Sequence, residues 1–324
     1  MKRKASLFPV LIWFAALSAI GTLMHIDLID AHNYPEQLKS HHQIVTHSAP
    51  APYQYRILQP AIVETILTLS KSEVGTHAYR SIFRGSYAIS RFLAIFTTFV
   101  AIFLSIRLIG SGTGAVFAAT TLAAFLPFTY RYYFYQPTSV LEMAFFGLGL
   151  LAIITRTPFV LLPLVAVGTL NRETMCFIPF AYFLYCLPKL KGTEWVWLVV
   201  SALVWILMFC GLRMLWPATH DLLNIQHYIA RNLTLSRGNI DLLVMISPLI
   251  IVLFGARQIP TPYLRLALCS VPWLIIHFLT SIWYEIRYYL PMLIWLLPAL
   301  VFIFSAESAT REDFLGAIHK TPPQ

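Results

Sequence analysis

Long apolar runs recur along this chain, and several of them are long enough to cross a lipid bilayer as helices. Residues 7–24 and 195–216 are two such runs, and a membrane-spanning helix needs about 20 mostly apolar residues. The chain as a whole is 58% hydrophobic and 11% charged, whereas soluble domains average about 25% charged residues. A water-soluble fold of this composition would lack the polar surface to cover itself. The sequence therefore predicts an all-α polytopic membrane protein.

With the first run, the apolar segments predict about ten spans in one integral membrane domain over residues 1–324. The further predicted spans are residues 92–108, 115–128, 139–154, 159–170, 175–187, 195–216, 242–255, 264–282 and 289–304.

The predicted orientation has both termini in the cytoplasm, because basic residues stay on the inner side. Three cations precede the first span, and no Lys or Arg follows it until Lys39. Residues 305–324 are then a short cytoplasmic tail, and the expected location is the bacterial inner membrane.

The composition also excludes several kinds of function. The net charge is +9, but the Lys and Arg residues are dispersed, so nucleic acid is not an expected partner. The four cysteines lie in apolar runs without CxxC spacing, which predicts buried thiols and neither disulfides nor a zinc site.

The most polar segment follows directly on the first run and forms the first outer loop, residues 25–90. It begins with two acids, Asp27 and Asp30, and continues to an aromatic and basic group that contains Tyr53, Tyr55 and Arg56. Apolar residues recur at helical spacing over residues 57–69, which predicts an amphipathic helix at the membrane surface. A second interfacial segment is expected over residues 79–91.

Under this topology, every unusual polar cluster falls on the outer face. Ionisable residues at the edge of the hydrocarbon are costly and usually mark a functional cavity. We therefore expect the clusters to converge in one outward-facing site. Besides the first outer loop, the clusters include Arg131, Glu142, Arg172, Glu173, Glu285 and Arg287, with the segments around His220 and residues 283–289.

The spacing of the charged residues adds two expectations. Glu285 and Arg287 are two residues apart and point away from each other on a helix, so their partners should lie on other segments or on a ligand. Asp27 and Asp30 are three apart and can face the same way, which suits a general base with a helper, or a divalent cation. No cofactor is otherwise indicated.

Histidines are expected to contribute little to the site. His41, His42 and His47 are predicted to be solvated loop residues and not metal ligands. His277 lies within a predicted span and is expected to be a hydrogen-bonded core residue.

The first span, the acids at its outer end (His25-Ile-Asp27-Leu-Ile-Asp30) and the long outer loop with short interfacial helices resemble the GT-C superfamily of membrane glycosyltransferases. The resemblance covers about the first 90 residues and the topology. It implies transfer of a sugar from a polyprenyl-phosphate donor to a glycan, lipid or protein acceptor at the outer membrane face. It also implies that Asp30 or Asp27 is the base.

By the same resemblance, Arg56, Arg172 and Arg287 would hold the lipid phosphate, and inversion would occur at the anomeric carbon. The expected sugar and lipid contacts are Tyr53, Tyr55, Arg131 and Glu142, with Glu173 and Glu285 orienting the arginines or binding sugar hydroxyls.

Other functions remain open at this point. One is a transporter or flippase of a phosphorylated lipid or other anion, although no internal repeat is found. Another is an enzyme of the O-antigen polymerase or ligase type, and a third is a non-catalytic assembly subunit.

Overall fold

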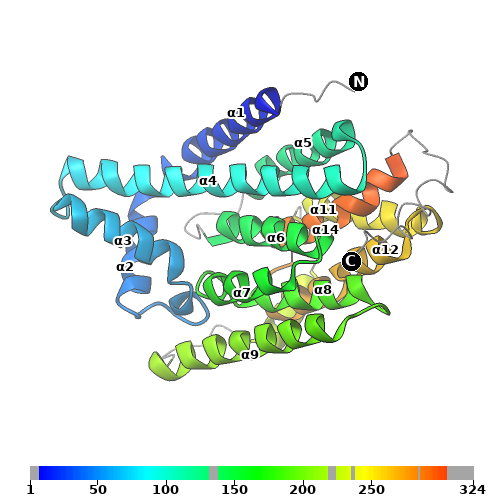
Figure 1. Ribbon diagram of the computed structural model, residues 1–324. Coiled ribbons are helices and arrows are strands. Elements are labelled where there is room, and N and C mark those ends of the chain that lie inside the picture. Colours follow the sequence, from blue (N-terminus) through cyan, green and yellow to red (C-terminus); the bar gives the residue numbers. More distant parts are fainter. Residues whose placement is uncertain (1–6, 131–137, 218–223, 235–237, 284, 305–324) are drawn as a thin grey trace.

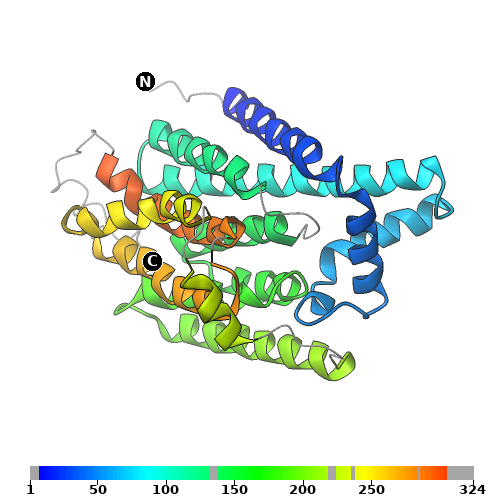
Figure 2. The same cartoon turned by 180° about the vertical axis from the view of Figure 1, so that it is seen from behind.

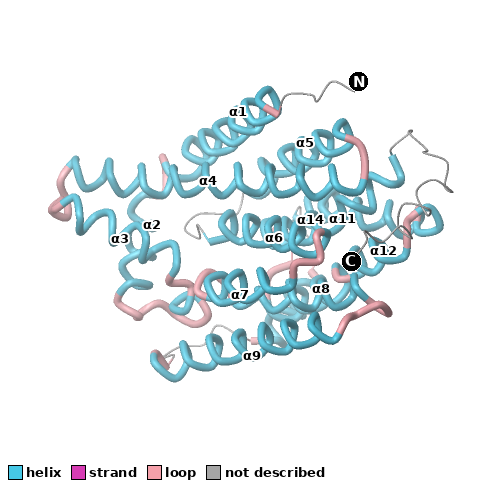
Figure 3. The backbone as a smooth tube through the Cα atoms, in the orientation of Figure 1, coloured by secondary structure: helices cyan, strands magenta, loops and turns pink. Residues whose placement is uncertain are grey.

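The computed structural model describes residues 7–130, 138–217, 224–234, 238–283 and 285–304. The described residues are helical, without a strand, and are joined mostly by short loops (Figure 3). Six segments are long and apolar enough to cross a membrane: Phe8–Asp30, His77–Ile109, Gly112–Thr129, Gly192–Leu215, Thr261–Thr280 and Ile286–Phe304. These helices support a membrane-embedded, all-helical protein. Further apolar helices are shorter, so the number of about ten spans stays a prediction.

Helix α4 (His77–Ile109) is the helix against which the neighbouring helices pack. It has 33 residues and begins at a Thr76 cap that accepts a hydrogen bond from the Tyr79 amide. At about 1.5 Å per residue it is about 50 Å long, more than the hydrocarbon core of about 30 Å. The expectation of a separate interfacial helix over residues 79–91 is therefore wrong, because those residues are the first turns of α4. They stay helical because Phe83 and its neighbours pack on the outer loop.

The helices α1 (Phe8–His25), α5 (Gly112–Thr129) and α6 (Thr138–Ile154) all pack against α4 (Figure 1). In α6, Gly147 allows close approach, since a Cβ there would meet the Cα of Thr98 at 3.4 Å.

Residues 31–76, the greater part of the predicted first outer loop, form a folded cap at one end of α4, seen in both Figure 1 and Figure 2. It contains α2 (Tyr34–Val45) and α3 (Leu58–Ser70). The helix expected over residues 57–69 is confirmed as α3, with Val63 and Leu67 buried and the apolar Ile66 and Leu69 exposed. Its place at the membrane surface stays a prediction.

The helices α7 (Leu161–Thr169) and α8 (Phe177–Cys186) form a hairpin. Arg156, before it, bonds to the Lys189 carbonyl after it, at 2.8 Å. With their 3₁₀ turns the two arms are about 18 Å and about 21 Å long. The tip, residues 171–174, is mostly buried. The Leu58 amide of the cap donates to the Leu170 carbonyl at 2.9 Å, and Trp205 of α9 (Gly192–Leu215) donates to the Glu173 carbonyl at 2.8 Å.

Helix α14 (Leu290–Phe304) lies at the centre, with all of Leu290 to Val301 buried. Aromatic rings from three helices surround it, among them Phe146, Phe177 and Trp273. The remaining helices are α10 (Ile225–Asn232), α11 (Gly238–Phe254), α12 (Thr261–Leu268) and α13 (Ser270–Thr280).

Candidate functional site

Two polar clusters lie where the cap meets the spans. The first, the Asp30 cluster, consists of His25, Asp30, Gln37 and Arg91. Arg91 donates from Nη1 to Asp30 Oδ2 at 3.0 Å, and His25 Nδ1 lies 3.2 Å from Asp30 Oδ1. Gln37 of α2 donates to the same Oδ1. Asp30 is thus an ionised carboxylate whose position is fixed from α1, α2 and α4.

Asp27 and Asp30 do not face the same way, contrary to expectation. Asp27 is exposed, whereas Asp30 is 3% exposed. The reason is a π-helical turn over Ile26–Asp30, in which the Ala31 amide bonds to the Ile26 carbonyl at 2.8 Å. Its wider winding rotates residues three apart away from each other, and such turns occur often at functional sites.

A pocket of about 400 Å³ lies against the Asp30 cluster. Its walls come from the end of α1 and from one face of α4, and Asp30 is the acid among them. Small-molecule sites have volumes of about 300–1,000 Å³, so this pocket is large enough for part of a substrate.

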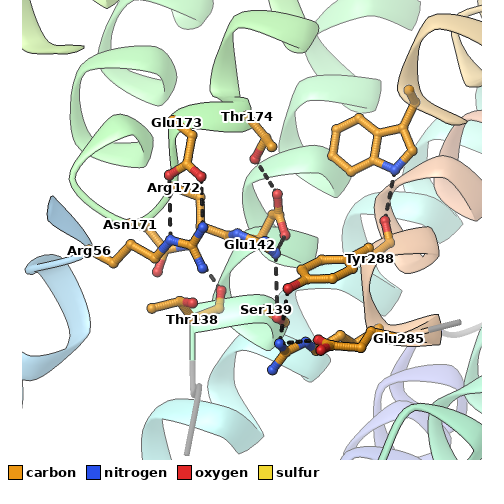
Figure 4. Close-up of polar contacts among 12 residues, drawn as sticks. Arg56, Thr138, Ser139, Glu142, Asn171, Arg172, Glu173, Thr174, Glu285 and Tyr288 are labelled. Atoms are coloured by element: carbon orange, nitrogen blue, oxygen red, sulfur yellow. Dashed lines mark hydrogen bonds and ion pairs between the residues drawn. The ribbon is translucent and has the colours of Figure 1, made fainter. Parts of the chain in front are cut away.

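The second cluster, the arginine–glutamate cluster, gathers six predicted site residues from four parts of the chain. Three guanidinium groups and three carboxylates meet there in pairs (Figure 4). The residues are Arg56, Glu142, Arg172, Glu173, Glu285 and Arg287.

Arg56 of the cap forms an ion pair with Glu173 at the tip of the hairpin. It donates to Glu173 from Nη2 at 2.7 Å and from Nε at 3.4 Å. Burial would lower the pKa of Arg56, but the charge and hydrogen bond of Glu173 outweigh burial and raise it above its ordinary range. Arg56 also lies over the Tyr53 ring at 5.0 Å, whereas Tyr55 contacts Arg213 at 4.4 Å.

Arg172 pairs with Glu142 of α6 in the most buried part of the cluster. The two side chains are 2% and 0% exposed. Glu142 also accepts a hydrogen bond from Thr174, and Arg172 lies over the Tyr288 ring at 5.1 Å. Asn171 donates to the Thr138 carbonyl at 3.0 Å, which joins the hairpin tip to the start of α6.

Glu285 and Arg287 pair with each other, so the expectation that they point apart is wrong. Arg287 lies in a 3₁₀ turn, Ile286–Tyr289, and Glu285 precedes this turn with a non-helical backbone (φ −76°, ψ 82°). Without an α-helix, residues two apart can meet. Arg287 also donates to the Tyr288 hydroxyl at 3.0 Å.

Two donors of this cluster have no acceptor among the described residues. They are Nη1 of Arg56 and Nε of Arg172, and both atoms are buried. Leaving a charged buried N–H unbonded is costly. A ligand with anionic oxygen atoms would supply hydrogen-bond acceptors for both donors.

The two clusters lie at about the same depth. Gln59 of α3, three residues after Arg56, donates to Ser90 beside Arg91 at 3.2 Å. Helices α4 and α6 touch where Thr98 of α4 meets Gly147 of α6. Arg91 lies seven residues before Thr98, and Val140 lies seven residues before Gly147. Because both helices rise about 1.5 Å per residue, Arg91 is level with the start of α6, which carries Glu142.

An apolar groove of about 470 Å³ lies beside Arg56. Its lining includes Ile57, the residue after Arg56, together with Pro60, Leu69 and Trp216. No residue of the arginine–glutamate cluster lines the groove, and the link between them is the sequence neighbour of Arg56, Ile57.

The structure thus joins most of the predicted site but pairs Asp30 with a residue outside it, Arg91. Sequence reasoning also missed His25, Gln37 and Tyr288. The available signal for Arg91 was a charge inside an otherwise apolar helix. Arg131 and His220 lie outside the described residues.

Of the predictions made for the histidines, the one for His277 is confirmed and the one for His41 is wrong. His277 is a hydrogen-bonded core residue as expected, 4% exposed and bonded to the Trp273 carbonyl at 2.9 Å. The expectation of solvation is wrong for His41, which is 4% exposed and bonds Tyr87 at 2.9 Å and Glu64 at 3.0 Å. It is buried because α2 packs on α3 and α4.

Within the described part of the chain, no group of three or more His, Cys, Asp or Glu residues could hold a metal ion. Whether a divalent cation takes part stays an open prediction.

Comparison with protein-family models, with curated proteins and with solved structures finds no match to this chain. The candidate site therefore rests on its own geometry.

Proposed function

We propose that this protein is a membrane glycosyltransferase of GT-C type that transfers a sugar from a polyprenyl-phosphate donor to an acceptor at the outer face, with inversion. The observation that carries the proposal is the meeting of Arg56, Arg172 and Arg287 in one buried cluster beneath the cap.

The buried N–H donors of that cluster suit a phosphate. Its three arginines are balanced by three glutamates, and two buried N–H donors remain for a ligand. As the bond between sugar and phosphate breaks, negative charge grows on the leaving phosphate. Fixed guanidinium groups in a poorly solvated site stabilise that charge without having to reorganise.

Asp30 is the better candidate for the base. It lines the pocket beside the Asp30 cluster, and its ion pair with Arg91 keeps it unprotonated, as a base must be before it takes a proton. Asp27 is exposed and lacks such support. Asp30 would take the proton of the acceptor hydroxyl while that oxygen attacks the anomeric carbon.

The apolar groove at Ile57 and Trp216 suits the first isoprene units of the donor. The groove also contains His47, Glu64 and Thr65, so the isoprene units of a lipid held at Arg56 would lie against its apolar residues, Ile57, Pro60 and Trp216. Glu173 and Glu285 orient arginines in this arrangement.

The proposal is tested with purified protein in proteoliposomes supplied with a panel of radiolabelled polyprenyl-phosphate hexoses. We expect protein-dependent release of polyprenyl phosphate from at least one donor. Arg172→Lys keeps the charge but loses the planar fork, and it should lower turnover by about 100-fold.

The matched control is Arg156→Lys, because Arg156 pairs with Glu194 at the opposite end of the hairpin at 2.8 Å. We expect its turnover to stay within about twofold of wild type. Absence of release from every donor, or equal losses in both variants, would contradict the proposal.

A transporter or flippase of a phosphorylated lipid is the second candidate. It is favoured by the short α7–α8 hairpin with its buried, charged tip, because interrupted helices near mid-depth are common in transporters. Protein-dependent movement of an intact labelled lipid between leaflets, without product, would identify that activity.

A further inference from the structure

The pocket beside Asp30 has a row of basic side chains that the donor site does not use. Its α4 wall carries His77, Arg80 and Arg84, with Ser81, Gly85 and Ala88 completing it. These positions are three or four apart, so they share one face of the helix. The opposite wall is formed by Ile26 and Asp30 of the π-helical turn after α1.

The net charge of this pocket is positive. Asp30 is already paired with Arg91 at 3.0 Å. In the described part of the chain, no carboxylate forms an ion pair with Arg80 or Arg84. Arg80 lies over the Tyr34 ring at 4.6 Å, which holds its guanidinium beside the pocket.

Lipid-facing surface continues from the pocket towards the membrane. Ile89 follows Gly85 by one turn on α4 and is 63% exposed, and Leu93 is 53% exposed. On α1, Leu23 precedes Ile26 and is 62% exposed. A basic pocket above exposed apolar side chains fits a lipid whose head carries a negative charge.

We propose that this pocket binds the phosphate of the acceptor, and that the acceptor is therefore a phosphate-bearing membrane lipid with a free hydroxyl group. The assignment of the lipid as acceptor rests on the proposed function, since it requires Asp30 to be the base. The binding of its phosphate by Arg80 and Arg84 does not.

The reaction then balances with the donor alone as co-substrate. The acceptor hydroxyl oxygen forms a bond to the anomeric carbon, and the bond from that carbon to the phosphate oxygen breaks. Asp30 takes the hydroxyl proton, and polyprenyl phosphate leaves. Arg80 and Arg84 hold the head of the acceptor so that its hydroxyl reaches Asp30.

The binding arm of the test uses full-length protein in detergent, titrated with short-chain phosphatidylglycerol and followed by native mass spectrometry. Diacylglycerol of the same chain length is the control lipid, because it has the hydroxyl but no phosphate. Arg80→Gln/Arg84→Gln should weaken phosphatidylglycerol binding by about tenfold or more and leave diacylglycerol binding unchanged.

Arg107→Gln is the matched protein control, since Arg107 is an exposed arginine at the other end of α4. It should change phosphatidylglycerol binding by less than about twofold. Equal binding by wild type and the double variant would overturn the pocket assignment.

The transfer arm separates this inference from the proposed function. In vesicles with a polyprenyl-phosphate donor that the enzyme uses, labelled sugar should appear on phosphatidylglycerol in preference to diacylglycerol. The double variant should lose that preference. Equal labelling of both lipids by wild type would overturn the acceptor assignment. Phosphate-dependent binding without any transfer would instead contradict the glycosyltransferase and leave a lipid-phosphate site.

Discussion

Arg91 of α4 holds Asp30, in the π-helical turn after α1, through a contact of 3.0 Å, and each of the two side chains is 4% exposed. The pair ties the end of the first span to the longest helix at the level of the cap. It also keeps a carboxylate charged beside a pocket. Stability and function therefore depend on the same two residues.

Arg91→Met should destabilise the protein, because it leaves Asp30 as a buried charge without its partner. The expected loss is about 3 kcal/mol in the free energy of unfolding. Adding Asp30→Asn should recover most of it, since no buried charge then remains. Thermal unfolding in detergent measures both variants. If the stability lost by the double variant equals the sum of the losses of Arg91→Met and Asp30→Asn alone, the pair is not coupled as described.

The cap should lose stability in mild acid because of His41. Burial lowers the pKa of His41 below its ordinary value of 6.5, against the hydrogen bond and charge of Glu64. The folded cap holds His41 neutral, so its contribution is complete above about pH 6.5 and is lost as pH falls towards the lower folded pKa. The melting temperature should drop between about pH 7.5 and about pH 5.5.

His41→Gln should show a smaller drop over the same interval. His42→Gln is its control, because the neighbouring His42 is exposed, and it should follow wild type. Identical pH profiles for all three proteins would rule out His41 as the titrating group.

The hairpin should be sensitive to added volume at Gly149 of α6. A Cβ there would lie 2.8 Å from Cγ2 of Ile178 in α8. Gly149→Ala should therefore cost about 1–3 kcal/mol of stability. Gly211→Ala in α9 meets nothing within 4 Å and should stabilise the protein by up to about 1 kcal/mol. A melting temperature for Gly149→Ala at or above wild type would contradict the close packing of α6 on α8.

The helices were predictable because apolar runs and helical spacing are local properties of the sequence. The amphipathic helix after Arg56 is one example. The length of α4 was not predictable, since Arg80, Arg84 and Arg91 make its first turns look like surface. Those turns are helical because α3 packs on them.

Arg56 and Glu173 could be expected to lie close together because both were predicted on the same face of the membrane, although they are 117 residues apart. The partner of Asp30 could not, because Arg91 was one charge among several in a segment expected to lie at the membrane surface. The separation of Asp27 from Asp30 depends on a π-helical turn, for which the sequence carries no recognised signal.

The central claim is that Asp30, held by Arg91 at about the depth of the arginine–glutamate cluster, is the base of a sugar transfer. The most direct test compares Asp30→Asn with Asp27→Asn in proteoliposomes, with a polyprenyl-phosphate sugar that wild type uses. Asp30→Asn should lower transfer by about 100-fold or more in protein that is still folded, although its melting temperature falls because Arg91 loses its charged partner. Asp27→Asn should stay within about twofold of wild type. Full transfer by folded Asp30→Asn protein would contradict the account.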